Sequence, residues 1–208
     1  MLDVDSTLIE DEVVELLADE AGVGAEVTAI TEAAMRGDLD FAASLERRLR
    51  LLEGLGADAI GRVRERVRVT RGVPQLVDGV HAAGGWVCAV SGGFHEVLDP
   101  LAEELGLDRW RANRLEAADG RLTGRSEGPV VDAAAKRDAL LTWAGELGVP
   151  LPRTIAVGDG ANDLLMMAAA GLSVAFAAKP TVRAAGDVVL NERDLGRVLP
   201  LLGLPRPS

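Results

Sequence analysis

Apolar residues recur at helical spacing through residues 11–70. In the first segment of this stretch they are Val13, Val14, Leu16 and Leu17, and in the third they are Phe41, Leu45, Leu49 and Leu52. Apolar residues repeated at three- and four-residue intervals are typical of amphipathic helices. We therefore expect a first helix that ends at Gly22 and Gly24, followed by helices over residues 25–36, 40–53 and 57–69.

From Val73 onward, short apolar runs alternate with helical segments. The expected strands cover residues 86–90, 154–157, 172–176 and 187–190, and the expected helices cover residues 74–83, 94–105, 132–147, 162–170 and 194–202. Asp119-Gly120, inside the alternating stretch 110–128, predicts a β-hairpin. Strands that alternate with helices predict an α/β fold, a Rossmann-like parallel sheet with helices on both faces.

Three polar residues, Asp3, Ser91 and Asp159, come directly after apolar strand candidates. Ligands of such sheets bind at the carboxyl ends of the strands, so we expect these side chains to converge on one site. The helical stretch lies between the first two of these strand ends and is expected to cover the site as a lid. The sequence thus predicts a core domain of residues 1–10 and 71–208, and an inserted helical-bundle cap domain of residues 11–70.

Composition and charge exclude several classes of partner. The chain has 208 residues, a net charge of −11 and a sequence pI of about 4.7, which disfavours nucleic acid and anionic membranes. The lone cysteine, Cys88, fits a reducing compartment, and no apolar stretch reaches the ~18 residues of a membrane span. We expect a cytoplasmic protein with no nucleic-acid or membrane partner; the sequence leaves monomer and dimer open.

Asp3 and Asp5, in the stretch Asp-Val-Asp-Ser-Thr, have the chemistry of a catalytic pair. A carboxylate can accept a phosphoryl group as an acyl phosphate, and a hard cation such as Mg2+ relieves the repulsion between the two anions. A second carboxyl group can protonate the leaving oxygen and later deprotonate water. The alternative is that Asp5 and Ser6 only cap the following helix.

Three later segments contain groups that such a pair needs. In Gly158–Asp163, Asp159 could complete a metal site, and Asn162 and Asp163 could support it, although the stretch also fits a plain turn before a helix. Ser91-Gly92-Gly93 suits a phosphate, or Ser91 is an N-cap. Lys136 could neutralise phosphate charge or could be a solvated helix residue.

Glu12 and Arg48 are candidates for substrate recognition in the helical stretch. A cap that selects an amino acid phosphate needs an acid for the ammonium group and a base for the carboxylate, and Arg suits bidentate carboxylate recognition. Both residues have neighbours of like charge, so solvated helix faces explain them equally well from spacing alone.

The residues named above resemble the four motifs of the haloacid dehalogenase-like phosphohydrolases in order and spacing. These motifs are Asp3 to Thr7, Ser91, Lys136 and Gly158 to Asp163. More narrowly, the wider stretches Asp3 to Glu15, Phe41 to Leu52, Val90 to Phe94 and Ala156 to Asp163 resemble the phosphoserine phosphatases.

The resemblance implies an enzyme that hydrolyses O-phospho-L-serine, a small phosphomonoester, with Mg2+ as the last step of serine biosynthesis. Asp3 would be the nucleophile and Asp5 the general acid/base, and the metal would be held by Asp3, the backbone carbonyl of Asp5 and Asp159. Asp163 would support the metal site. The phosphate and the rest of the substrate would contact Ser91, Gly92, Lys136, Glu12, Arg48, Asn162 and the apolar Phe41.

Two alternatives and one departure remain at this point. The protein could transfer the phosphoryl group to another hydroxyl compound such as homoserine, or act on a different small phosphomonoester. A non-catalytic phosphate sensor is disfavoured because every motif residue is retained. The family normally has a full apolar strand before the first Asp, whereas only Met1 and Leu2 precede it here, so the native start could lie upstream.

Overall fold

Four helices lie between the first residues of the chain and the rest of the fold. The computed structural model, which describes residues 1–35 and 38–205, places α1 at Val13–Ala21, α2 at Gly24–Met35, α3 at Phe41–Leu51 and α4 at Asp58–Arg66. The predicted helices are confirmed, although the predicted end of the second falls on residues 36–37, outside the described residues. Helix α4 ends earlier than predicted because Arg68 pairs with residues 10 and 11 instead: its carbonyl accepts Glu10 N–H at 2.9 Å, and its own N–H donates to Asp11 at 2.8 Å.

The remainder of the chain alternates strands and helices, as predicted. The strands are β1 (Cys88–Phe94), β2 (Arg109–Ala118), β3 (Arg121–Glu127), β4 (Ile155–Gly158), β5 (Leu172–Phe176) and β6 (Val188–Leu190). The helices are α5 (Val73–Ala82), α6 (His95–Leu105), α7 (Ala133–Glu146), α8 (Leu164–Ala169), α9 (Pro180–Ala185) and α10 (Val198–Leu201). Helix α9 was not predicted, because it has only one buried apolar side chain, Val182, and so shows no apolar repeat.

One predicted strand boundary is wrong. The sequence predicted a strand over residues 86–90 that ends before Ser91-Gly92-Gly93, but β1 begins at Cys88 and continues through these residues to Phe94. The register against β2 shifts between Val90 and Phe94, so the glycines form an irregular strand end rather than a separate turn.

The sheet is built around Leu2. Strand β1 pairs in parallel with β2, and β4 and β6 both pair in parallel with β5. Leu2 forms parallel bridges with Ala89 of β1 and Val157 of β4, so the first three residues join the two halves of the sheet. The N–H of Leu2 donates to the Cys88 carbonyl at 2.8 Å, and the N–H of Asp3 donates to the Val157 carbonyl at 2.9 Å.

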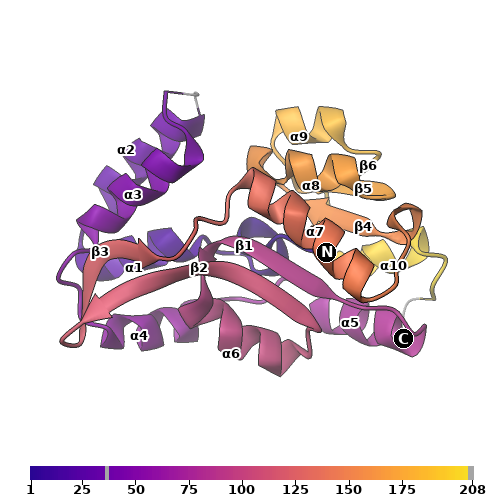
Figure 1. Cartoon of the computed structure of the whole chain (residues 1–208), viewed down its shortest axis with the longest axis horizontal. Helices are drawn as coiled ribbons and strands as arrows, with labels where there is room; N and C mark the ends of the chain where they lie inside the picture. The colour runs from indigo at the N-terminus through magenta and orange to yellow at the C-terminus, as the bar shows by residue number, and fades with distance from the viewer. Residues whose placement is uncertain (36–37, 206–208) are drawn as a thin grey trace.

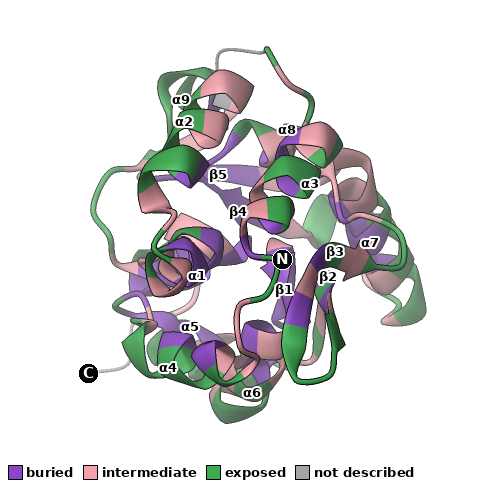
Figure 2. Ribbon diagram, turned by 90° about the vertical axis from the view of Figure 1, so that its left-hand side faces the viewer, coloured by how far each residue is buried: buried purple, intermediate pink, exposed green. Residues whose placement is uncertain are grey.

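Alternate residues of the strands pack against opposite layers of helices (Figure 1, Figure 2). Ala89, Val157 and Val174 belong to the hydrophobic cluster that includes residues of α5, α6 and α10, whereas Val90 and Ala156 belong to the cluster formed with α7, α8 and α9. Successive side chains of a strand point to opposite faces, so both faces of this sheet are covered. The predicted α/β fold with helices on both faces is confirmed.

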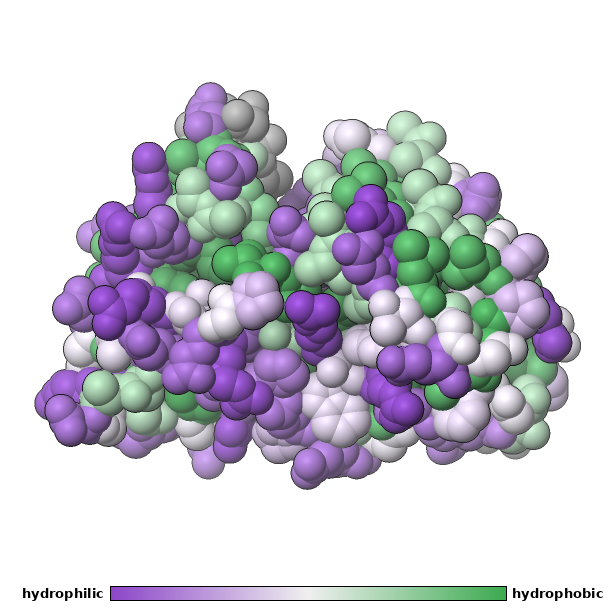
Figure 3. Space-filling model, viewed as in Figure 1, coloured by the Kyte–Doolittle hydropathy of each residue, from purple (hydrophilic) through white to green (hydrophobic). Residues whose placement is uncertain are grey.

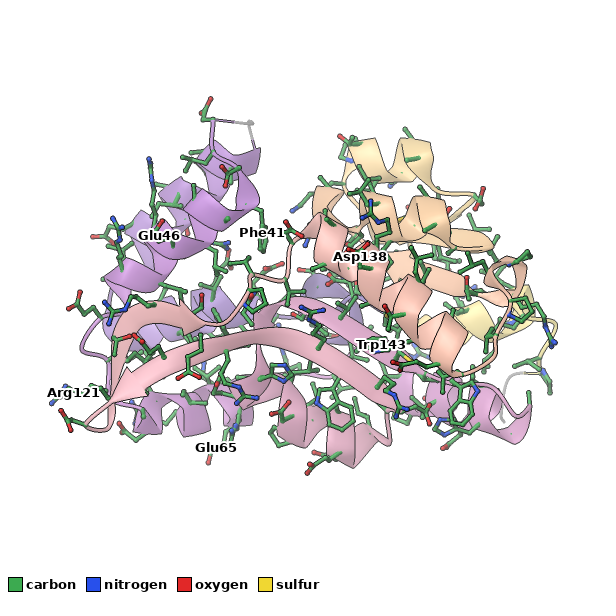
Figure 4. All side chains as sticks on the ribbon, viewed as in Figure 1. Phe41, Glu46, Glu65, Arg121, Asp138 and Trp143 are labelled. Atoms are coloured by element: carbon green, nitrogen blue, oxygen red, sulfur yellow. The ribbon has the colours of Figure 1, made fainter. Side chains whose placement is uncertain are left out.

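The predicted hairpin joins the sheet to the helices that precede it. Strands β2 and β3 pair antiparallel, and Asp119 and Gly120 turn the chain with φ of 51° and 74°, as the sequence predicted. At its tip, Ala57 N–H donates to the Gly120 carbonyl at 2.9 Å, and the Arg121 side chain donates to the Gly54 carbonyl at 2.7 Å. Figure 4 places Arg121 at this tip, below α3. The hairpin therefore anchors one end of the helical stretch.

None of the helices in the described part of the chain combines the length and the apolar run that a bilayer span requires.

Replacing Leu2 should weaken the whole sheet. Leu2 is only 3% exposed and lies between β1 and β4, so Leu2→Ala should lower the free energy of unfolding by about 2–5 kcal/mol. The matched control is Leu141→Ala on α7, where the side chain is 39% exposed and the expected change is about 0.5 kcal/mol or less. Urea denaturation followed by circular dichroism measures both; equal losses would contradict the central role of Leu2.

Candidate active site

A cavity of about 570 Å3 opens at the carboxyl ends of the strands, between the helical stretch and the sheet. Figure 3 shows the surface notched between these two parts. The structure brings all eleven residues predicted for the site to this place. Eight line the cavity, namely Asp3, Asp5, Glu12, Phe41, Arg48, Gly92, Asp159 and Asn162. The other three, Ser91, Lys136 and Asp163, lie buried behind them and contact them directly.

Asp3 is held at the base of the cavity by Lys136. The Lys136 ammonium group is fully buried; it contacts Asp3 Oδ1 and donates to Asp163 Oδ1 at 2.8 Å. Burial alone would lower the pKa of Lys136. Asp163 and Asp3 raise it by more than burial lowers it, so the net pKa lies above its ordinary value and the ammonium group is charged. Burial and the neighbouring Asp163 and Asp159 raise the pKa of Asp3, while Lys136 opposes them. Lys136 is therefore not a solvated helix residue.

Asp5 leaves the same turn but has different partners. Its Oδ1 accepts the backbone N–H of Val13, the first residue of α1, at 2.8 Å, and its Oδ2 accepts the Ser91 hydroxyl at 3.1 Å. Burial and then repulsion by Glu12 raise the pKa of Asp5 to about 7. A carboxyl group with this pKa exchanges its proton readily at neutral pH. The capping alternative is thus partly correct, because Asp5 satisfies a free N–H of α1 while it also faces the cavity.

The Gly158–Asp163 turn is shaped by Asp163. Its Oδ2 accepts the N–H groups of Asp159 and Gly160, at 3.2 and 3.0 Å, and its Oδ1 accepts Lys136. A Cβ at position 158 would lie 2.4 Å from Asp163 Oδ2, so glycine is needed there for close approach. Both Asp163 oxygens are occupied, whereas Asp159 has one long contact, from the Thr7 hydroxyl at 3.4 Å. Asp159 is the freer ligand of the two.

Ser91 does not cap α6, which removes the N-cap alternative. The N-cap of α6 is Phe94, and it makes no side-chain cap hydrogen bond. Instead, Ser91 Oγ accepts the Gly93 N–H at 2.7 Å while its hydroxyl donates to Asp5. The irregular end of β1 therefore brings Gly92 to the cavity wall and the Ser91 hydroxyl behind Asp5.

The helical stretch forms one wall of the cavity and contributes a negative charge, from Glu12, and a positive charge, from Arg48. Glu12 accepts the Ser6 hydroxyl at 2.7 Å, and Arg48 donates to the Ser44 carbonyl at 3.3 Å. Burial lowers the pKa of Arg48, while Glu12 and Asp5 oppose this effect. Phe41 lies on the side of α3 that faces the sheet (Figure 4), and a Cβ on Gly92 would approach its Cζ within 2.6 Å. This wall therefore touches the core at Phe41 and Gly92.

Sequence reasoning missed two residues of the site. Lys179 lines the cavity, and its N–H donates to the Asp159 carbonyl at 3.1 Å. It follows β5, so the rule that pointed to polar residues after strands could have found it. Thr7 is fully buried and contacts Asp159. It stands in an irregular turn over Val4–Leu8, where Asp5 and Ser6 have non-helical backbone angles, and no local signal shows which distant residue its hydroxyl contacts.

Three buried carboxyl groups lie close enough together to bind one cation. Oxygen atoms of Asp3, Asp159 and Asp163 all lie within 4.8 Å of one another. One ammonium group, from Lys136, cannot neutralise three carboxylates, and the raised pKa values of Asp3 and Asp159 reflect burial first and then the remaining repulsion. Oxygen donors of this kind suit hard divalent cations. The residues therefore fit a metal ion.

A second cavity, of about 470 Å3, lies at the opposite ends of the strands. It is largely apolar, with Leu2, Trp86, Leu140 and Trp143 among its lining residues, and it contains none of the carboxylates described above. The chemistry of the molecule is thus concentrated at the carboxyl ends of the strands.

Comparison with known proteins shows the family of the chain. The family model described as haloacid dehalogenase-like hydrolase matches residues 1–168. The chain belongs to the haloacid dehalogenase-like hydrolases. Its relatives in this family include the phosphoserine phosphatase of Streptomyces coelicolor, 53% identical over 206 residues, which are 99% of this chain and 50% of that protein. The phosphoserine phosphatase of Streptococcus thermophilus is 48% identical over 202 residues, which are 97% of this chain and 94% of that protein.

Solved structures from the haloacid dehalogenase-like hydrolases show the same fold. A structure described as a phospho-aspartyl intermediate analogue of phosphoserine phosphatase superposes with a TM-score of 0.92 at 41% identity and covers 97% of this chain and 96% of that one. A substrate-bound phosphoserine phosphatase complex superposes with a TM-score of 0.92 at 40% identity and the same coverage. The chain spans about half the length of the Streptomyces relative and nearly all of these two structures.

The carboxylate cluster should make the metal-free protein sensitive to pH. Burial and repulsion by Asp163 raise the pKa of Asp159 from 3.8 to about 6. The folded state therefore binds this proton more tightly than the unfolded state, and the free energy of unfolding falls as the pH rises from about 4 through about 6. Asp159→Asn should remove this loss and stabilise the chelator-treated protein at pH 7 by about 1–3 kcal/mol. The same variant should gain little from an added divalent cation.

Urea denaturation at pH 4 and pH 7, with chelator or with a divalent cation, measures both effects. Asp187→Asn is the matched control, since hydrogen bonds from Ser173 lower the pKa of Asp187 and the sign should be opposite. A destabilised Asp159→Asn variant at pH 7 in chelator would contradict the proposed repulsion.

Proposed function

We propose that this chain is a Mg2+-dependent phosphatase that hydrolyses O-phospho-L-serine to serine and phosphate, the last step of serine biosynthesis. The observation that carries the proposal is that one cavity is lined by Asp3, whose carboxylate contacts the buried Lys136, and by Asp159, Glu12 and Arg48. The cluster suits a phosphoryl group, and the other two suit an ammonium group and a carboxylate. The names of the relatives support this substrate. A cytoplasmic location, favoured by the free Cys88, is part of the proposal.

In this proposal Asp3 is the nucleophile and Asp5 the general acid and base. A carboxylate oxygen of Asp3 attacks phosphorus, the bond from phosphorus to the serine oxygen breaks, and Asp5 donates its proton to that oxygen. Asp5 then takes a proton from water, whose oxygen attacks phosphorus and breaks the bond to Asp3, which releases phosphate. The pKa of Asp5, about 7, allows both proton transfers.

Asp3, Asp159 and the backbone carbonyl of Asp5 are the proposed holders of Mg2+, with Asp163 in support. When bound, such an ion offsets the repulsion between carboxylate and phosphate. Lys136, Ser91 and the N–H of Gly92 would hold phosphate oxygens. Lys136 is suited to this because it already neutralises Asp3, which keeps the anionic nucleophile in place.

Residues 11–70 would act as a cap domain over a core of residues 1–10 and 71–208. Glu12 would bind the substrate ammonium group and Arg48 its carboxylate, with Asn162 as a further contact. Phe41 would exclude water where it meets Gly92.

Asp3→Asn should abolish turnover and leave the fold intact. The amide cannot form the acyl phosphate, so phosphate release should fall by at least about 1,000-fold. Phosphate release is measured with a panel of phosphorylated amino acids and sugars, with Mg2+ and with chelator. The control is Asp138→Asn, an exposed carboxylate on α7, which should retain full activity. Near wild-type activity of Asp3→Asn would refute the assigned nucleophile, and turnover of the panel without preference for phosphoserine would refute the substrate.

Arg48→Ala should separate substrate recognition from phosphoryl chemistry. Removing the guanidinium group should lower kcat/KM for phosphoserine about 10- to 100-fold, since a charge-assisted contact is lost. Turnover of a generic aryl phosphate, which has no carboxylate, should change less than about threefold by the same reasoning. The neighbouring Arg47 is exposed, so Arg47→Ala is the matched control. Equal losses on both substrates for Arg48→Ala would favour another phosphomonoester as the substrate.

A further inference from the structure

Asn113 is a buried polar residue that none of the roles above uses. It lies on β2, opposite Phe94, where the pairing of β1 with β2 becomes irregular, and it is 2% exposed. Its side chain donates from Nδ2 to the Gly92 carbonyl at 2.8 Å and accepts the Val131 N–H at Oδ1, also at 2.8 Å. A carbonyl can only accept and an N–H can only donate, so one orientation of the amide satisfies both contacts.

The first contact leads to Asp5. Asn113 fixes the carbonyl of the Gly92–Gly93 peptide, and the N–H of that peptide donates to Ser91 Oγ at 2.7 Å. Because the Gly93 N–H occupies a lone pair of Ser91 Oγ, the Ser91 hydroxyl proton is directed to Asp5 Oδ2, at an O–O distance of 3.1 Å. The peptide plane is flanked by glycine on both sides, so few steric contacts of its own would hold its orientation.

The second contact leads to Lys136. Val131 directly precedes Asp132, the N-cap of α7, whose side chain accepts the Ala135 N–H at 2.8 Å and whose carbonyl accepts the Lys136 N–H at 2.9 Å. The Lys136 ammonium group in turn contacts Asp3. One buried amide thus connects the segment that carries Ser91 with the segment that carries Lys136.

We propose that Asn113 is a positioning residue, which sets the Ser91 hydroxyl and the start of α7 in register for phosphate binding. It does not touch the cavity and acts through Gly92 and Val131. The inference rests on the proposed phosphatase function, but its central claim, that Asn113 acts through Ser91, can also be tested on phosphate binding alone.

Two variants separate the contacts. Asn113→Asp keeps an acceptor for Val131 N–H and loses the donor to Gly92, whereas Asn113→Leu is close in volume, adds no charge and loses both. Each should lower kcat/KM for phosphoserine about 10- to 100-fold, as expected for a small displacement of binding groups. The affinity for inorganic phosphate with Mg2+, measured by calorimetry, should fall about 10-fold.

A double-mutant cycle tells positioning from general support. If Asn113 acts through Ser91, then adding Asn113→Asp to Ser91→Ala should lower kcat/KM by less than about threefold relative to Ser91→Ala alone. The hydroxyl that Asn113 positions is already absent in that background. A merely structural role predicts that the fold-losses in kcat/KM of the two single variants multiply in the double variant. The control is Ser173→Ala on β5, which removes a hydrogen bond from a buried hydroxyl to Asp187 at the surface and should lower Tm without changing kcat/KM.

The measurements test the role of Asn113 separately from the proposed phosphatase function. Multiplicative losses, or kcat/KM and phosphate affinity of Asn113→Asp within twofold of wild type, would overturn the positioning role. Absence of wild-type phosphoserine turnover would overturn the proposed function instead, and the phosphate affinities of the same four proteins in the cycle would still decide the role of Asn113.

Discussion

The structure depends on one buried cation, the Lys136 ammonium group, placed between carboxylates from distant parts of the chain. An unpaired charge in a protein interior costs several kcal/mol, so Lys136 requires Asp3 and Asp163 beside it. The amino-terminal residues, α7 and the loop after β4 are thereby held together. Asp159 adds a carboxylate that Lys136 does not contact directly, and the remaining negative charge suits a divalent cation.

Backbone pairing in the sheet positions these charged side chains. Because Leu2 pairs with both β1 and β4, Asp3 leaves the sheet between the ends of those two strands. Ser91 at the end of β1 and Asp159 after β4 then lie on either side of it, at the edge where parallel sheets bind their ligands. At the opposite end of β4, the amino group of Met1 donates to the Ile155 carbonyl at 2.9 Å. Three residues of backbone thus fix the position of the nucleophile candidate.

Local sequence patterns predicted the layers and the strand ends, since alternation and strand-following polar residues are short-range signals. They could not predict what depends on distant partners. Nothing in the run Ala133 to Arg137 shows that Lys136 is buried, because its partners are far away in sequence. The predicted strand ended at residue 90, before the glycines, but pairing with β2 and the amide of Asn113 keep that segment in the sheet. Asn113 itself stands inside a strand, where a polar residue normally indicates a solvent-facing position.

Electrostatics couples the helical wall of the cavity to the acids below it. Repulsion by Glu12 is the largest Coulombic contribution that raises the pKa of Asp5, and Glu12 also raises the pKa of Asp159. A ligand ammonium group beside Glu12 would offset this repulsion and lower the pKa of Asp5. A lower pKa would make the Asp5 carboxyl group a stronger acid while the ligand is bound. Glu12 thus links the charge of the cavity wall to the acidity of Asp5, and a ligand without an amino group would not produce this change.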